Sequence, residues 1–180
     1  ANYTPNTAAR ALVNKGTNAI GVMANNLHDP FFHDLILGFE TGAMETEYNV
    51  VFCSAMGKDM QEKRRYIRYL SNGVVDGIIL YGAYTVDEGF IRELHDARYP
   101  LLLIESAVEG IHAHHFFVDN RGGVCDAMRH LHAHGHQRIA YIAGKQNKQV
   151  CADRLNGFLA AARELMLEVP SNLLRFIDQG

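Results

Sequence analysis

Hydrophobic and polar positions along the chain form blocks that predict strands and helices in turn. Residues 19–24 (AIGVMA) are a short apolar run of strand length, and the polar residues 25–29 end it. A helical pattern then extends from Phe31 to residue 47, because its apolar positions recur at intervals of three and four residues. These positions are Phe32, Leu35, Ile36, Phe39 and Ala43. Asp29 suits the N-cap of this helix, and Pro30 suits its first position.

The same order of strand, loop and helix continues to the end of the chain. Further strands are expected at 50–55, 76–81, 101–104, 115–118, 138–143 and 173–177, and further helices at 59–70, 87–97, 121–134 and 151–167. Asp59 and Glu62 form a capping-box pattern at one helix start, and Gly135 suits a left-handed C-terminal cap. The alternation predicts an α/β fold with parallel sheets flanked by helices.

One break in the alternation suggests a domain boundary. Around residues 101–118 two strands follow each other with no helix between them. We interpret this as the passage between two lobes, 16–117 and 118–180. The second lobe has few strands, so we expect it to be incomplete and to have an open sheet edge. Residues 1–15 stand apart, and a helix at 6–13 is too short to be stable without a partner.

Composition and charge narrow the possible classes. The 180 residues are 48% hydrophobic and 21% charged, as in ordinary globular proteins. The net charge of −3 gives no global attraction to nucleic acid or anionic membranes, so any DNA contact must come from a small local element. No stretch approaches the roughly 20 apolar residues of a membrane span, and no export signal opens the chain. The widely spaced Cys53, Cys125 and Cys151 suggest reduced thiols in a cytoplasmic protein.

Patterns typical of enzymes and metal sites are missing from the sequence. Residues 25–27 (NNL) follow the first strand where a dinucleotide-binding protein has G-x-G-x-x-G, and neither a Walker sequence nor a G-x-S-x-G elbow occurs. We therefore predict no enzymatic activity and no cofactor. His130 and His134 share a helix face, but two histidines without a nearby carboxylate or cysteine make an incomplete metal site. No metal site is predicted.

Several short motifs occur together in one characteristic order. They are 3–12 (YTPNTAARAL), 20–22 (IGV), 29–32 (DPFF), 75–79 (VDGII), 118–120 (VDN), 135–140 (GHQRIA) and 154–158 (RLNGF). As an ordered set they resemble the lac and purine repressor family, the LacI/GalR-type transcriptional regulators, over essentially the whole chain. The resemblance implies a periplasmic-binding-protein-like architecture of two lobes. It also implies effector-controlled transcription, usually repression, by cytoplasmic homodimers on palindromic operators. The family's helix-turn-helix domain is not in this sequence.

The resemblance assigns residues 1–15 to the DNA hinge. Small residues such as Ala9 allow the paired hinge helices of a dimer to enter a minor groove. Leu12 matches the position at which the family inserts a leucine between base pairs, which unstacks a step and kinks the duplex. Asn6 and Arg10 are expected to contact phosphates or groove edges. The alternative interpretation is a frayed tail without a role. We expect disorder in the isolated fragment and the hinge in the whole protein.

The loop between the first strand and helix is the first ligand-site candidate, because open α/β sheets bind ligands at the carboxyl ends of their strands. Asp29 either caps the helix or accepts hydrogen bonds from sugar hydroxyls. Phe31 is free to line a cleft, whereas Phe32 belongs to the core stripe. Arg154 is a surface arginine by default, but it matches the arginine with which the family holds its effector, and its planar fork suits vicinal hydroxyls or a carboxylate.

Other residues complete the predicted site. Ser106 and Asp119 lie at strand ends, where they either reach the cleft or cap a turn, and Lys148 belongs to a loop before a helix. The predicted effector-binding residues are Asp29, Phe31, Phe32, Ser106, Asp119, Lys148 and Arg154. The predicted DNA-binding residues are Asn6, Ala9, Arg10 and Leu12.

Two function classes share this architecture. The leading prediction is a ligand-sensing regulator whose small-molecule effector, expected to be a carbohydrate, closes the lobes and changes operator affinity. The resemblance places its dimer surface on the outer faces of helices 30–47 and 59–71. The alternative is a periplasmic-type solute-binding protein without DNA binding, against which residues 3–12 and the missing signal sequence argue. A sugar-active enzyme has no positive feature.

Overall fold

The computed structural model describes residues 16–28, 30–56, 59–82, 88–144 and 149–177. The chain divides into two compact units, Ala1–Phe116 and Phe117–Gly180, and each is described by itself. Six of the predicted site residues lie outside the described residues: Asn6, Ala9, Arg10, Leu12, Asp29 and Lys148. Among the described residues, no helix is both long and apolar enough to cross a membrane.

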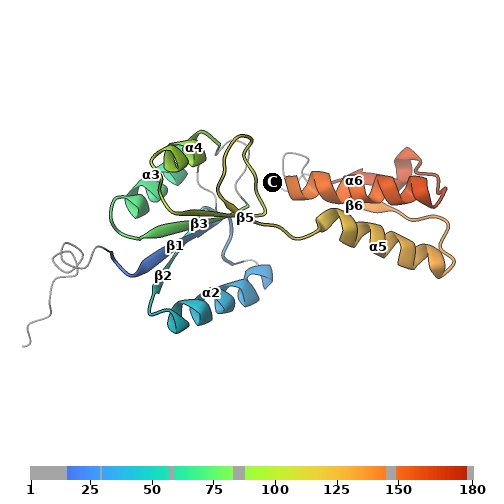
Figure 1. Ribbon diagram of the computed structural model, residues 1–180. Helices are drawn as coiled ribbons and strands as arrows, with labels where there is room; N and C mark the ends of the chain where they lie inside the picture. The colour runs from blue at the N-terminus through green and yellow to red at the C-terminus, as the bar shows by residue number, and fades with distance from the viewer. Residues whose placement is uncertain (1–15, 29, 57–58, 83–87, 145–148, 178–180) are drawn as a thin grey trace, which may run out of the picture. The chain divides into compact units, whose positions relative to one another are not determined.

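A five-stranded parallel sheet forms the centre of the first unit (Figure 1). Its strands are β1 (Ala19–Ala24), β2 (Asn49–Ser54), β3 (Gly77–Tyr81), β4 (Leu101–Ile104) and β5 (His114–Phe116). They stand in the order β2-β1-β3-β4-β5, so the strand order reverses between β1 and β3. In Figure 1, α2 (His33–Glu45) covers one face of the sheet, and α3 (Met60–Ser71) and α4 (Glu88–Asp96) cover the other.

The core of this unit forms where α3 and α4 pack on the sheet. Leu70, Ile91 and Leu103 are completely buried there. The helical spacing predicted for α4 is confirmed, because Phe90 and Leu94 are buried beside Ile91. The predicted capping box at the start of α3 is also confirmed. The Asp59 carboxylate accepts a hydrogen bond from the Glu62 N–H (2.9 Å), and the Glu62 carboxylate accepts one from the Asp59 N–H (3.3 Å).

The first helix begins later than the sequence predicts. Pro30–Phe32 form a 3-10 turn, and α2 starts at His33 with Phe32 in the N-cap position and no side-chain cap. Short 3-10 turns are common at helix starts, and this one delays the α-helical pattern by a turn. The predicted stripe faces inward nevertheless. Phe32 and Ala43 are buried, and the three apolar positions between them are half-buried.

The second unit packs two helices beside a short parallel pair of strands. Its elements are α5 (Asn120–Ala133), β6 (Tyr141–Ala143), α6 (Gln149–Glu164), a 3-10 turn at Ser171–Leu173 and β7 (Leu174–Phe176). Its core consists of Met128, Phe158, Ala161 and Ala162. The helices approach closely at Gly157, where a Cβ atom would lie 2.5 Å from the Arg121 carbonyl oxygen. Arg129 joins the same helices through two hydrogen bonds to Glu164, of 3.0 and 2.8 Å.

The expected bounds of two strands need correction. The strand predicted at 138–143 is shorter, because β7 offers partners only to Tyr141–Ala143 and the residues before β7 form a 3-10 turn. The strand predicted at 115–118 is His114–Phe116, which pairs with β4. Gly135 has the predicted left-handed conformation, with φ at +86°.

Candidate functional site

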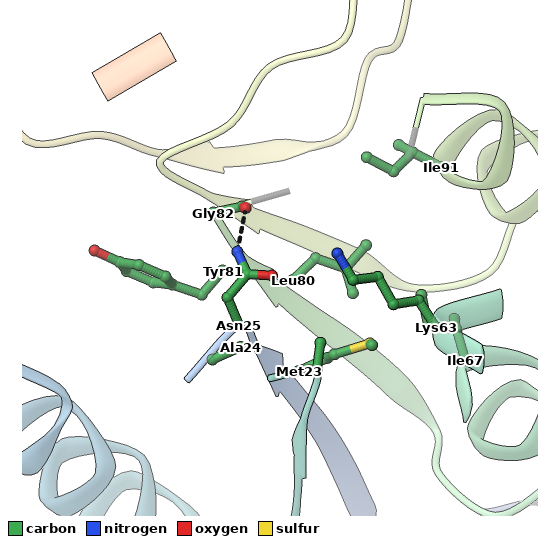
Figure 2. Close-up of a pocket in the computed structure, with 10 residues that line it drawn as sticks. Met23, Ala24, Asn25, Lys63, Ile67, Leu80, Tyr81, Gly82 and Ile91 are labelled. Carbon is green, nitrogen blue, oxygen red and sulfur yellow. Dashed lines mark hydrogen bonds between the residues drawn. The ribbon is translucent and has the colours of Figure 1, made fainter. Parts of the chain in front are cut away.

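The carboxyl ends of β1 and β3 border a small cavity of about 30 Å³. It has room for one or two water-sized groups. The lining comes from the carboxyl ends of β1, β2 and β3 and from α3 and α4 (Figure 2): Met23, Ala24, Asn25, Ala55, Lys63, Ile67, Leu80, Tyr81, Gly82 and Ile91. The strand order reverses between these two strands, and ligands of open α/β sheets bind at such a point. The cavity is therefore the centre of the candidate site in the first unit.

Asn25 and Gly82 connect the two strand ends above this cavity. The Asn25 side-chain amide donates a hydrogen bond to the Gly82 carbonyl at 3.1 Å (Figure 2). Gly82 has φ at +63°, a left-handed conformation that glycine adopts without strain. The bond fixes the start of the loop that the sequence singles out, although Asn25 itself was not predicted as a site residue.

Three aromatic rings from the loop and the strand end pack together beside the cavity. Phe32 is only 7% exposed, and its ring centroid lies 4.8 Å from that of Tyr81 in an edge-to-face arrangement. Phe31 is 59% exposed, at 5.7 Å from Phe32 and 6.2 Å from Tyr81. The predicted division between a core Phe32 and an accessible Phe31 is confirmed. Their contact with an effector stays a prediction.

Lys63 brings a cationic group to the edge of this cavity. It comes from α3, is half-buried, and extends its ammonium end toward the strand ends in Figure 2. The sequence places Lys63 only on the inner face of a helix. Lys63 precedes the buried Ile67 and Leu70 by four and seven residues, and this helical spacing is the signal in the sequence that points to it.

Ser106 lies at the end of β4, outside the lining of the cavity. It is only 3% exposed, and within the described part of the chain its hydroxyl has no hydrogen-bond partner. Its carbonyl oxygen lies 3.3 Å from His115 Nδ1. The preceding Glu105 is also buried and has a left-handed backbone, with φ at +53°. The structure thus keeps Ser106 near the same sheet edge but not in the cavity.

In the second unit, Arg154 and Asn120 form a direct contact between two helices. Arg154 is exposed on α6, and its Nε donates a hydrogen bond to Asn120 Oδ1 at 2.7 Å. The Asn120 amide also donates to the Val118 carbonyl at 3.2 Å. Asp119 is the N-cap of α5, since its carboxylate accepts a hydrogen bond from the Gly122 N–H at 2.7 Å. Of the two interpretations left open for Asp119, capping is therefore observed.

Tyr141 adds a phenol to this group. Its ring stacks on Phe158 with centroids 4.8 Å apart. Burial raises the pKa of Tyr141, the charge of Arg154 lowers it, and Cys151 raises it. The Tyr141 phenol thus lies close enough to Arg154 and Cys151 for both residues to act on its pKa. Neither Asn120 nor Tyr141 was predicted as a site residue; Asn120 belongs to the short motif at 118–120, which was the available signal.

His130 and His134 lie close together, as predicted from their shared helix face. The ring centroids of His130 and His134 are 4.3 Å apart, and His134 Nδ1 lies 2.8 Å from the His130 carbonyl oxygen. Within the described ranges, no group of three or more histidine, cysteine, aspartate or glutamate side chains is placed to hold a metal ion.

The open parallel sheet, with helices on both faces and a polar and aromatic edge at its point of reversal, is a fold of ligand-binding α/β domains. Residues 17–179 match the family described as periplasmic binding proteins and sugar binding domain of LacI family. The chain belongs to this family. The predicted α/β, periplasmic-binding-protein-like fold and the resemblance to LacI-type regulators are thereby confirmed.

Individual relatives show the extent of the match. The chain is 28% identical over 175 residues to the HTH-type transcriptional repressor PurR of Vibrio atlanticus, covering 96% of this chain and 52% of that relative. It thus spans about half the length of the curated relatives it matches. The transcription regulator CcpA of Lactococcus lactis has a similar fold, with a TM-score of 0.75 and 21% identity over 90% of this chain and 59% of that chain.

A third relative has been solved with a sugar. It is a periplasmic binding protein/LacI transcriptional regulator from Alkaliphilus metalliredigens QYMF, complexed with D-xylulofuranose. The TM-score is 0.69 and the identity 25%, over 89% of this chain and 56% of that chain.

Proposed function

We propose that this chain is the effector-binding part of a ligand-responsive transcriptional regulator, most plainly a repressor that works in the cytoplasm. The observation that carries the proposal is the family match over residues 17–179, together with a repressor relative that aligns over 96% of the chain. The proposal includes no enzymatic step. It treats operator binding as a property of the intact protein, of which this chain supplies the sensing half.

The effector in this proposal is a sugar or a related polyol. An exposed aromatic ring such as Phe31 offers an apolar surface to the C–H face of a sugar ring, and its contacts with the buried Phe32 and the half-buried Tyr81 keep it in place. Phe32 then supports the site from the core instead of touching the ligand. The D-xylulofuranose bound by one relative belongs to the same ligand class.

Arg154 is the effector-binding residue proposed for the second unit. Its Nε is committed to Asn120, and within the part of the chain that the structure describes its two Nη groups have no hydrogen-bond acceptor. A guanidinium fork fixed at one nitrogen is oriented before the ligand arrives, so less conformational freedom is lost on binding. Ser106, Asp119, Asp29 and Lys148 remain further proposed members of the site.

Control of DNA binding is assigned to the first 15 residues. We propose that they form the DNA hinge, with Leu12 as the apolar wedge and with Asn6, Ala9 and Arg10 at the groove. Effector binding changes operator affinity through a coupling free energy between the two sites. Homodimerisation through the outer faces of α2 and α3 completes the proposal, because palindromic operators require paired hinges.

A solute-binding protein without DNA binding is the alternative with the same fold. It predicts sugar binding but no affinity for DNA. The intact gene product is therefore to be titrated against operator-like palindromes and a scrambled duplex at fixed salt concentration, since salt strongly changes all DNA affinities. Preferential binding of a palindrome supports the regulator. Sugar binding with equal, weak affinity for every duplex supports the alternative.

A further inference from the structure

The amino ends of β1 and β3 lie at the edge of the sheet opposite the candidate site, and Asp76 joins them there. One oxygen of its carboxylate accepts hydrogen bonds from the Thr17 N–H (2.7 Å) and the Thr17 hydroxyl (2.9 Å). The other accepts one from the Asn18 N–H (2.8 Å). Three donors from two consecutive residues thus converge on one side chain that is 58 and 59 positions away in the sequence.

Backbone contacts hold the same short segment from two sides. The Asp76 N–H donates to the Ala19 carbonyl at 2.7 Å, and the Asn49 N–H donates to the Asn18 carbonyl at 2.8 Å. Asn18 has a left-handed backbone, with φ at +51°, so its conformation needs such support. A Cβ atom on Gly16 would lie 3.1 Å from the Asp76 carboxylate, so this glycine passes close to it. The path of the chain through residues 16–18 is thereby fixed.

The electrostatics agree with this geometry. Burial raises the pKa of Asp76, but the hydrogen bonds from Thr17, Asn18 and Ala19 together outweigh it and hold the pKa below its ordinary value. Hydrogen bonds to an ionised carboxylate are shorter and stronger than those between neutral groups. The contact between Asp76 and residues 17–18 is therefore a strong local constraint.

We infer that Asp76 is a positioning residue for DNA binding: by fixing Thr17 and Asn18, it sets the direction in which the segment 1–15 leaves the effector-binding unit. The inference rests on the proposed function, because it takes this segment as the DNA hinge. Asp76 lies at the other end of β1 and β3 from the candidate site, so it acts on the hinge without touching the effector. Its role is separate from those of Phe31 and Arg154.

Substitution of Asp76 by asparagine tests this inference with the smallest change in shape. An amide replaces one carboxylate oxygen, so an N–H donor then faces the N–H or hydroxyl donors of residues 17–18. Operator affinity of the intact protein should fall by about tenfold or more, the range expected for lost hydrogen bonds to a charged group. Sugar affinity should change by less than about threefold, since no contact at the other sheet edge is altered. Thr17→Val, which removes only the hydroxyl donor, should have a smaller effect.

Glu164→Gln is the matched control, because it likewise replaces a hydrogen-bonded carboxylate by an amide, here the one that accepts two hydrogen bonds from Arg129 in the second unit. If Asp76 has only a structural role, both variants should lose stability, and both should bind the operator with the affinity of the wild type. Equal operator affinity of Asp76→Asn, Glu164→Gln and the wild type would overturn the inference. If the wild type itself prefers no palindrome, the proposed function fails instead. Trypsin cleavage, which needs no DNA, then still shows whether Asp76 holds residues 17–18 in place.

Trypsin cleavage after Lys15 gives that second readout without DNA. This bond immediately precedes the segment that Asp76 fixes, and cleavage requires local opening of residues 16–18. Asp76→Asn should accelerate cleavage there by about tenfold, whereas Glu164→Gln should not. Unchanged cleavage of Asp76→Asn would show that the carboxylate does not hold the segment and would overturn the inference.

Discussion

Arg154 on α6 donates a hydrogen bond from Nε to Oδ1 of Asn120, the first residue of α5, over 2.7 Å. The contact orients the guanidinium plane and leaves its outer edge for other acceptors. Asn120 is held in turn by its bond to the Val118 carbonyl. An exposed arginine with this support differs from an ordinary surface arginine, whose long side chain samples many rotamers.

Replacing Arg154 with alanine should weaken effector binding by about 10- to 100-fold, the effect of losing hydrogen bonds to a charged group. The thermal midpoint should change little, because the side chain is exposed. Asn120→Ala should have a smaller effect in the same direction, because the guanidinium group remains but is no longer oriented. Calorimetric titration of the intact protein with sugars gives these affinities.

Arg163→Ala is the control for this experiment, since Arg163 is an exposed arginine in the last turn of the same helix. It should bind the effector as the wild type does. Wild-type affinity in Arg154→Ala would refute the proposed role of Arg154.

Substitutions of the two adjacent phenylalanines should have different effects, one on the stability of the fold and the other on sugar binding. Phe32→Ala should lower the free energy of unfolding by about 3–5 kcal/mol, because it removes a large buried side chain. Phe31→Ala should lower it by less than about 1 kcal/mol, because the ring is largely exposed, yet it should weaken sugar binding. Urea denaturation and sugar titration of both variants test this. Equal loss of stability in the two variants would contradict the assigned burial.

Close packing of α5 and α6 gives a prediction for the second unit. Gly157→Ala should lower its stability by about 1–3 kcal/mol, because the new Cβ atom meets the Arg121 carbonyl at 2.5 Å. Gly123→Ala is the matched control in α5, since open space surrounds that position. It should raise stability by about 0.5–1 kcal/mol through better helix propensity. Thermal unfolding of both variants measures the difference, and destabilisation of the two by the same amount would contradict this packing.

These elements show which parts of the fold the sequence predicts well. The spacing of Phe90, Ile91 and Leu94 and the capping box of Asp59 and Glu62 are local signals, and the structure confirms both. The bounds of β6 depend on how far β7 extends beside it, and nothing in residues 138–143 carries that information. The late start of α2 likewise depends on a 3-10 turn that a periodic pattern does not distinguish from a helix.

The candidate site shows a similar division. The exposure of Phe31 and burial of Phe32 follow from helical periodicity, because adjacent residues point in different directions. The contacts of Asn120 with Arg154 and of Asn25 with Gly82 join residues 34 and 57 positions apart. Such pairs depend on strand order and helix packing. Asp76 is the clearest case, because the sequence shows it only as the first residue of an expected strand, whereas its contacts with Thr17 and Asn18 span 59 and 58 positions.

The pH dependence of stability provides a test of the Asp76 contacts. A carboxyl group with a lowered pKa in the folded state stabilises the fold above its unfolded pKa, and this contribution is lost as the pH falls through the folded pKa. The ordinary pKa of this carboxyl group is 3.8, so its stabilising contribution is lost below about pH 4. The difference in unfolding free energy between the wild type and Asp76→Asn should therefore be constant near pH 7 and shrink below pH 4. A difference that stays constant down to pH 3 would contradict these contacts.

Coupling between sugar and operator is the most direct test of the account as a whole. The dissociation constant of the intact protein for its operator is to be measured by fluorescence anisotropy with and without a bound sugar, for the wild type and for Arg154→Ala. A saturating effector should change the operator affinity of the wild type by about 5- to 150-fold, the usual range of allosteric coupling. At the same sugar concentration, Arg154→Ala should show no change. Operator affinity that is identical with and without every sugar that the wild type binds would contradict the account.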